Sequence, residues 1–214
     1  MHLRILVEAA PKKAFASAID WPGLSRSGRD EATALEALAA RLTRYAPVAA
    51  AAGRPFDPDG AMLEVVERVP GDASTEFGVP SQIARADREA LTAAEADRLA
   101  TIVAAAWSCF DAVAAAAPEE LRKGPRGGGR DTSKIVAHIN DADSAYAHIL
   151  GRKHQPTDRA AVEAMRADVL DALRQPSDGS PVAGRKWPPR YAARRIAWHA
   201  LDHAWEIEDR SEPA

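Results

Sequence analysis

The sequence predicts an α+β protein that is mainly α-helical, with a small α+β domain ahead of a four-helix bundle. Alanine supplies 48 of the 214 residues, and alanine has the highest helix propensity of all residues. Strand-like alternation occurs within residues 1–69, and four segments with helical periodicity follow within residues 90–214. Residues 70–89 between them are rich in Gly, Pro, Ser and Asp without a helical period, so we expect a linker.

The first domain shows the element order strand, strand, helix and strand. Apolar residues alternate along residues 3–8 and again along 15–19, which predicts a hairpin. A turn signal at residues 20–23 (DWPG) precedes leucines and a tyrosine at helical spacing over residues 31–45. Residues 63–69 restore the strand pattern, and the domain is therefore expected to pack one helix on a small sheet.

The second domain contains four segments with the pattern of amphipathic helices. The first has the clearest beginning, because Thr92 and Glu95 form a capping box that satisfies free backbone donors. Prolines end the first and third segments, and a proline pair opens the fourth, where the first helical turn tolerates proline. Amphipathic helices of this number and length form a bundle. The expected helices are 93–117, 132–149, 157–175 and 188–209.

Composition and charge exclude several classes of protein. The formal net charge of −3 argues against a protein whose whole surface faces nucleic acid. The longest apolar stretch, residues 102–117, contains Asp111 and is shorter than the roughly 20 residues of a membrane span. Cys109 is the single cysteine, and the first residues lack the features of an export signal. We therefore expect a cytoplasmic protein that contacts no membrane and does not favour nucleic acid as a partner.

Three histidines form a candidate metal site. His199 and His203 are four residues apart, which places both imidazoles on one helix face about 6 Å apart along the axis. They share a stripe with apolar residues, so we expect them to point into the bundle. His138 lies at the margin of the apolar face of the second bundle helix and can also point inward. Three nitrogen donors would leave positions open for water or substrate, as in a catalytic zinc site.

The alternative interpretation is that these histidines belong to the core. Each buried imidazole would then be satisfied locally by Asp202, Glu206 or a backbone carbonyl. The two carboxylates have two further interpretations, because they can orient ligand imidazoles from an outer shell or face solvent. The sequence fits all of these arrangements.

A basic, glycine-rich segment at residues 122–130 precedes the second bundle helix. Glycines allow the backbone to wrap an anion, and the helix N-terminus adds a positive dipole. Arg126 and Arg130 are therefore candidates to bind the carboxylate or phosphate of a ligand. The segment lacks the ending of a P-loop, which argues against nucleotide hydrolysis, and a solvated loop is the alternative.

The last predicted helix, residues 194–206 (RRIAWHALDHAWE), looks like the last helix of the DinB superfamily of four-helix-bundle proteins. Residues 132–139 (TSKIVAHI) resemble that superfamily's second helix, and the resemblance covers residues 90–210. In that family three histidines hold a divalent metal, usually zinc or nickel. Characterised members include transferases and isomerases that use mycothiol or bacillithiol. The resemblance therefore implies the three histidines as metal ligands and a low-molecular-weight thiol as cosubstrate.

Residues 1–45 are similar to the HicB-like antitoxin fold, through the strand at residues 3–8, the DWPG turn and the helix at 31–45. Antitoxins of this type usually add a DNA-binding region, and here a helical bundle takes its place. This replacement favours a structural or dimerising module over toxin neutralisation or RNA contact.

Two hypotheses follow from the sequence. The first is a metal-dependent enzyme with a small-molecule or thiol substrate, of the transferase or isomerase type. The second is a non-enzymatic regulatory or interaction protein, in which the HicB-like module binds a partner and the bundle stabilises or dimerises it. A second apolar stripe on the last helix is expected to pack in the core, with a pocket or a homodimer interface as alternatives. The stripe comprises Trp198, Leu201 and Trp205.

Overall fold

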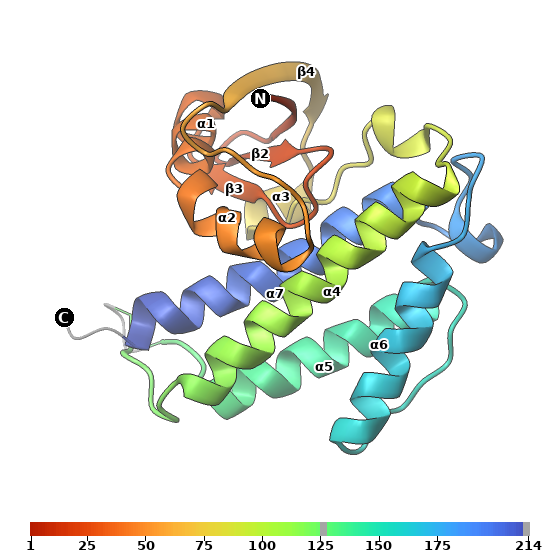
Figure 1. The fold of residues 1–214 in the computed structure, drawn as a ribbon. Coiled ribbons are helices and arrows are strands. Elements are labelled where there is room, and N and C mark those ends of the chain that lie inside the picture. The colour runs from red at the N-terminus through yellow and green to blue at the C-terminus, as the bar shows by residue number, and fades with distance from the viewer. Residues whose placement is uncertain (125–127, 212–214) are drawn as a thin grey trace.

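The computed structural model describes residues 1–124 and 128–211 and confirms a mainly helical α+β protein. A four-stranded sheet and its covering helices form one side of the molecule (Figure 1). Two long helices lie between this part and the remaining pair of the bundle, so they have neighbours on both sides. The central helices are α4 (Ala93–Ala116) and α7 (Pro189–Ser211), and the outer pair is α5 (Thr132–Ile149) and α6 (Arg159–Leu173).

The sheet is mixed and has the strand order β3-β2-β1-β4. The predicted hairpin is present, since β1 and β2 pair antiparallel, and β4 pairs parallel with β1. Strand β3 was not predicted, because its sequence, SRSG, has no apolar alternation. The strands are β1 (His2–Ala9), β2 (Ala14–Ala18), β3 (Ser25–Gly28) and β4 (Met62–Pro70).

The helix predicted at residues 31–45 is divided into α1 (Glu31–Ala39) and α2 (Leu42–Ala51). Helix α1 packs on the sheet, whereas α2 packs on α4. Tyr45 is fully buried on α2 and its hydroxyl donates to the carbonyl of Pro22 at 2.8 Å. The apolar period continues across the break, which is why the sequence pattern indicated a single helix.

Residues 70–89 contain the short helices α3 (Ala73–Phe77) and η1 (Ala86–Arg88), where the sequence predicts a linker without helical structure. Asp72 caps α3 in a reciprocal capping box with Thr75. The buried Thr75 hydroxyl also donates to the Glu8 carboxylate of β1 at 2.9 Å. These contacts hold the segment against the sheet.

The four predicted bundle helices are present. Helix α4 begins at the predicted capping box, in which the Thr92 side chain accepts from the Glu95 backbone and the Glu95 carboxylate accepts from the Thr92 backbone. Helix α6 begins later than predicted, because the side chain of Asp158 caps it by accepting from the Ala161 N–H. Helix α7 begins with Pro189, in the position that the sequence predicts, and a 3-10 turn, η2 (Val182–Gly184), precedes it.

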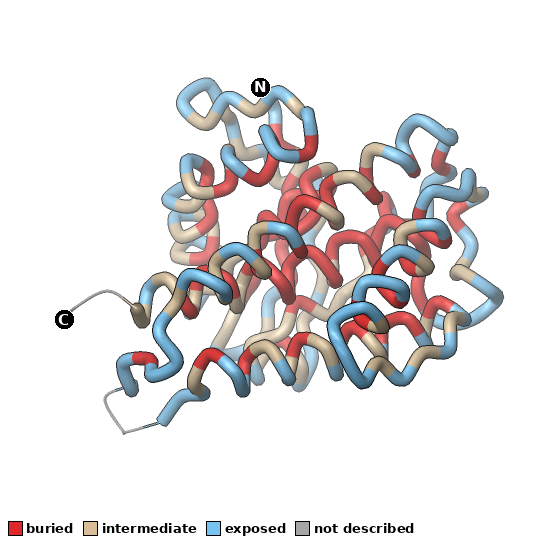
Figure 2. Tube along the Cα trace, turned by 60° about the horizontal axis from the view of Figure 1, so that its bottom comes forward, coloured by how far each residue is buried: buried red, intermediate tan, exposed pale blue. Residues whose placement is uncertain are grey.

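One continuous cluster of buried apolar residues extends from β1 to α7 (Figure 2). Trp198 of α7 meets Phe15 of β2 with ring centroids 6.1 Å apart. Leu201 and Trp205 are buried in the same cluster, so the second apolar stripe of α7 packs in the core. The sheet and the bundle therefore share one hydrophobic core.

Helix α4 is the one described helix that is long and apolar enough to cross a membrane by length and composition. It packs against α7, α6 and α2, and its buried residues include Leu99, Val103 and Phe110. This arrangement is compatible with a soluble protein.

Candidate metal centre

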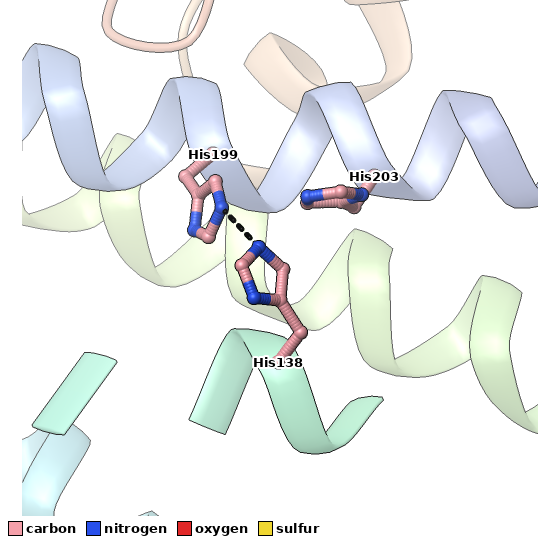
Figure 3. Close-up of side chains that lie close together, drawn as sticks. All are labelled: His138, His199 and His203. Atoms are coloured by element: carbon pink, nitrogen blue, oxygen red, sulfur yellow. Dashed lines mark hydrogen bonds between the residues drawn. The ribbon is translucent and has the colours of Figure 1, made fainter. Parts of the chain in front are cut away.

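The three candidate histidines come from two facing helices and converge on one point. His199 and His203 lie one turn apart on α7, and His138 lies on α5. Figure 3 shows the imidazole of His138 reaching across to the two imidazoles of α7. The three side chains converge because α5 packs against α7. Residue spacing within one helix does not predict that packing.

The rings are close enough to share a ligand. The Nε2 atoms of His138 and His199 are 3.2 Å apart. Ring centroids are 5.0 Å apart for His138 and His203 and 4.9 Å apart for His199 and His203. One ligand nitrogen from each residue lies within 4.8 Å of the other two.

Glu206 orients the imidazole of His203. Its carboxylate accepts a hydrogen bond from Nδ1 of His203 at 2.7 Å, and Arg210 donates to the other oxygen at 2.7 Å. The hydrogen bond from His203 is the largest cause that lowers the pKa of the Glu206 carboxyl. With Nδ1 engaged, Nε2 of His203 is free to face the other two rings, which is the usual outer-shell arrangement for a ligand histidine.

Asp202, the other carboxylate predicted to orient the imidazoles, makes no hydrogen bond to them among the described residues. Its carboxylate pairs with Arg26 of β3, with 2.9 Å between Oδ1 and Nη1. The reason lies in helix geometry: His199, His203 and Glu206 share one face of α7, and Asp202 is turned about 100° from His203 toward the sheet. Asp202 therefore joins α7 to the first part of the chain.

Burial and nearby positive charge favour the neutral form of the His199 and His138 imidazoles. His199 is 7% exposed, and burial, together with the charges of His203 and Arg195, lowers its pKa to about 2. Partial burial and the charge of His203 also lower the pKa of His138. Neutral imidazole is the form that binds a metal, so His138 and His199 are favoured in the state that a ligand requires.

His199 lacks the partner that the alternative interpretation requires. Its Nδ1 atom is buried without a hydrogen-bond partner among the described residues. The hydrogen bond that the described structure gives its side chain is with another candidate ligand, His138. A core histidine satisfied by a carboxylate or carbonyl is therefore not what the structure contains at this position.

The three donors suit a tetrahedral metal. Imidazole nitrogens bind zinc at roughly 2.0–2.1 Å, which places neighbouring ligand nitrogens about 3.4 Å apart. The His138–His199 pair already has this spacing, and the largest separation in the group is within 4.8 Å. An all-imidazole donor set suits zinc or nickel rather than magnesium or calcium.

The basic segment before α5 lies near the site. Arg126 lies outside the described residues. Arg130 is exposed, and its charge lowers the pKa of both His138 and His199, which places it within electrostatic range of the cluster. The Arg122 backbone N–H donates to the carbonyl of Arg210 at 3.0 Å, which holds the start of the segment against the end of α7.

Two residues that border the cluster were not predicted from the sequence. The ring of Tyr146 on α5 lies 5.8 Å from that of His199. The guanidinium of Arg195 lies 5.5 Å from the Tyr146 ring. The signal was present, because Arg195 is four residues before His199 and Tyr146 is eight after His138, and both spacings keep a helix face.

Comparison of the chain with protein-family models, curated protein sequences and solved structures found no match in any of the three.

Proposed function

We propose that the protein is a metal-dependent enzyme in which His138, His199 and His203 bind one divalent ion, zinc or nickel. The observation that carries this proposal is the convergence of three imidazoles from α5 and α7. Three ligands from the protein leave at least one position open, as in catalytic rather than structural zinc sites.

The chain's own residues have distinct roles in this proposal. Such an ion would lower the pKa of a bound thiol or water and so supply a nucleophile at neutral pH. Glu206 holds His203 in the tautomer that offers Nε2. Burial of His199 excludes protons that would compete for its nitrogen. His138 and His203 are partly exposed, which gives a ligand access to the site.

The substrate class comes from the resemblance to the DinB superfamily. We propose a cytoplasmic transferase or isomerase that uses a low-molecular-weight thiol as cosubstrate, with Arg130 near enough to contact its anionic groups. The reaction type depends on this resemblance, whereas the metal site is supported by the geometry.

Zinc titration by calorimetry tests the ligand assignment. Chelator-treated wild-type protein should bind about one equivalent. Separate alanine substitutions at His138, His199 and His203 should each weaken binding more than the roughly 10- to 100-fold that loss of an outer-shell partner costs. His148→Ala, which removes an exposed histidine of α5, is the control and should bind as wild type. Wild-type affinity in any of the three ligand variants would contradict that residue's assignment.

The role of Glu206 has its own matched test. Glu206→Gln should weaken zinc binding by about 10- to 100-fold, because the weaker acceptor orients and polarises His203 less. Glu208→Gln removes the same charge two residues away, from a carboxylate that pairs with Arg44 of α2, and should leave zinc affinity unchanged. Equal effects of the two substitutions would show that charge alone matters and that Glu206 does not orient the imidazole.

A further inference from the structure

The side chain of Arg195 packs against two aromatic rings beside the three histidines. It lies one helical turn before His199 on α7, and its side chain is only partly exposed. Its guanidinium carbon lies 4.6 Å from the ring centroid of Trp198 and 5.5 Å from that of Tyr146. Both rings in turn lie within 6.0 Å of the His199 ring. Arg195 therefore belongs to the immediate surroundings of the candidate metal centre.

The charge of Arg195 has no counterion in the described part of the chain. Its Nη1 atom is buried and makes no hydrogen bond to the described residues, and no described carboxylate lies within ion-pair distance. Its neighbours on α7 differ in this respect. Arg194 pairs with the buried Asp87, and Arg190 lies 3.6 Å from Asp20. A buried donor of a charged group without a partner costs more free energy than an ordinary lost hydrogen bond.

The positive charge of Arg195, taken alone, disfavours the binding of a metal cation beside it. The Arg195 guanidinium packs on the Tyr146 and Trp198 rings that border His199, so its charge repels a divalent cation bound at that imidazole. An anion between the two positive charges would remove the repulsion and supply the missing acceptor. A bound substrate is the natural source of that anion, because the unpaired guanidinium lies one helical turn from His199 and packs on two rings that also border this imidazole.

We propose that Arg195 binds a carboxylate of the small-molecule substrate, so that the enzyme selects thiols or substrates that carry a carboxylate near the reacting atom. This inference rests on the proposed metal-dependent function. A planar carboxylate matches the guanidinium fork. The four residues from Arg195 to His199 span about 6 Å along the axis of α7, so two lengths of the chain between the carboxylate and the reacting sulfur are compared.

The test uses full-length protein loaded with cobalt(II), whose visible absorption reports a thiol entering the metal site. The probes are 3-mercaptopropionate and 4-mercaptobutyrate, each compared with its neutral amide of the same length. For at least one length, wild type should bind the carboxylate at least about tenfold more tightly than the amide, the size of one hydrogen bond to a charged group.

Three variants separate recognition by Arg195 from other causes. Arg195→Met should reduce the ratio of carboxylate affinity to amide affinity to near unity and leave cobalt stoichiometry unchanged. Arg195→Lys keeps the charge and should keep part of the preference. Arg185→Met removes an exposed charge close before α7 and should behave as wild type. A preference that persists in Arg195→Met would assign the carboxylate to the metal or to another cation and would overturn the proposal.

Failure of this inference is distinguishable from failure of the proposed function. Stoichiometric cobalt binding with equal affinity for carboxylate and amide in wild type would overturn the role of Arg195 alone. Absence of cobalt binding, or cobalt binding that survives alanine at all three histidines, would overturn the metal-dependent function and this inference with it.

Discussion

At the scale of single residues, environment determines what each histidine can do. The chain has six histidines, and three of them meet between α5 and α7. His154, in contrast, bonds to Asp168 at 2.9 Å, and His148 is exposed. His199 is the most constrained member of the cluster, because it is buried among positive charges and lacks an acidic partner.

The buried state of His199 predicts a pH-dependent stability of the metal-free protein. Its pKa is about 2 in the folded protein and 6.5 without perturbation. Below about pH 6.5, His199 therefore binds a proton in the unfolded chain but not in the folded protein. The free energy of unfolding consequently decreases as the pH falls. Between about pH 7 and pH 5 this effect removes about 2 kcal/mol of the free energy of unfolding.

Urea unfolding of chelator-treated protein at several pH values measures this loss. His199→Gln lacks the titrating group, so its free energy of unfolding should fall less than that of wild type over the same interval. Parallel pH profiles of wild type and His199→Gln would show that His199 is not held neutral by the fold.

Residue spacing predicted part of the site but not all of it. The four-residue spacing of His199 and His203 follows from helix geometry alone, and so does their shared face with Glu206. The outward turn of Asp202 toward Arg26 depends on where the sheet packs, which no local pattern specifies. Arg195 was missed because an arginine on a helix ordinarily indicates a solvated face, and only the approach of Tyr146 from α5 shows otherwise.

At the scale of elements, α7 carries two functions on two faces. Trp198 packs on Phe15 of β2 and Leu201 lies against the turn at Gly23, whereas His199 and His203 meet His138 of α5. The sequence predicted the helix and both stripes, because apolar and polar positions repeat at helical spacing. It did not predict β3, whose pairing with β2 is set by the turn before it rather than by apolar residues.

That turn approaches α7 closely at Gly23. The backbone there has φ +92°, and an added Cβ would lie 2.6 Å from Cδ1 of Leu201. Gly23→Ala should therefore lower the free energy of unfolding by more than the about 1–3 kcal/mol typical of a left-handed non-glycine residue. Gly53→Ala is the matched control, because Gly53 has φ +66° and no heavy atom within 4 Å of an added Cβ.

Chemical unfolding of both variants compares the two costs. The Gly23 variant should be the less stable, since it adds steric overlap with α7 to the backbone strain that both variants share. Equal destabilisation would indicate that the turn does not press against α7.

At the scale of the whole molecule, the segment expected to separate two domains makes tertiary contacts. Residues 70–89 were predicted as a linker from composition, and compositional reasoning does not detect tertiary pairing. In the structure Asp87 is fully buried and pairs with Arg194 of α7, and the Tyr191 hydroxyl donates to the carbonyl of Ser81 at 3.1 Å. The segment therefore fixes the part of α7 that leads to the candidate metal centre.

The buried Asp87–Arg194 pair predicts strong coupling between this segment and α7. Arg194→Met would leave the Asp87 carboxylate buried without its counterion, which should cost about 3–5 kcal/mol of the free energy of unfolding. Arg85→Met removes an exposed arginine from the same segment and should change it by less than about 0.5 kcal/mol. Thermal or urea unfolding checks both values, and a small effect of Arg194→Met would mean that the segment does not support α7.

The most direct test of the central claim is the metal content of the full-length protein purified without chelator or affinity tag. We expect about one equivalent of zinc or nickel in wild type and none in the His199→Ala/His203→Ala double variant. Equal metal content in the two proteins would contradict the three-histidine site. So would a wild-type protein that contains no zinc or nickel and takes up neither at neutral pH.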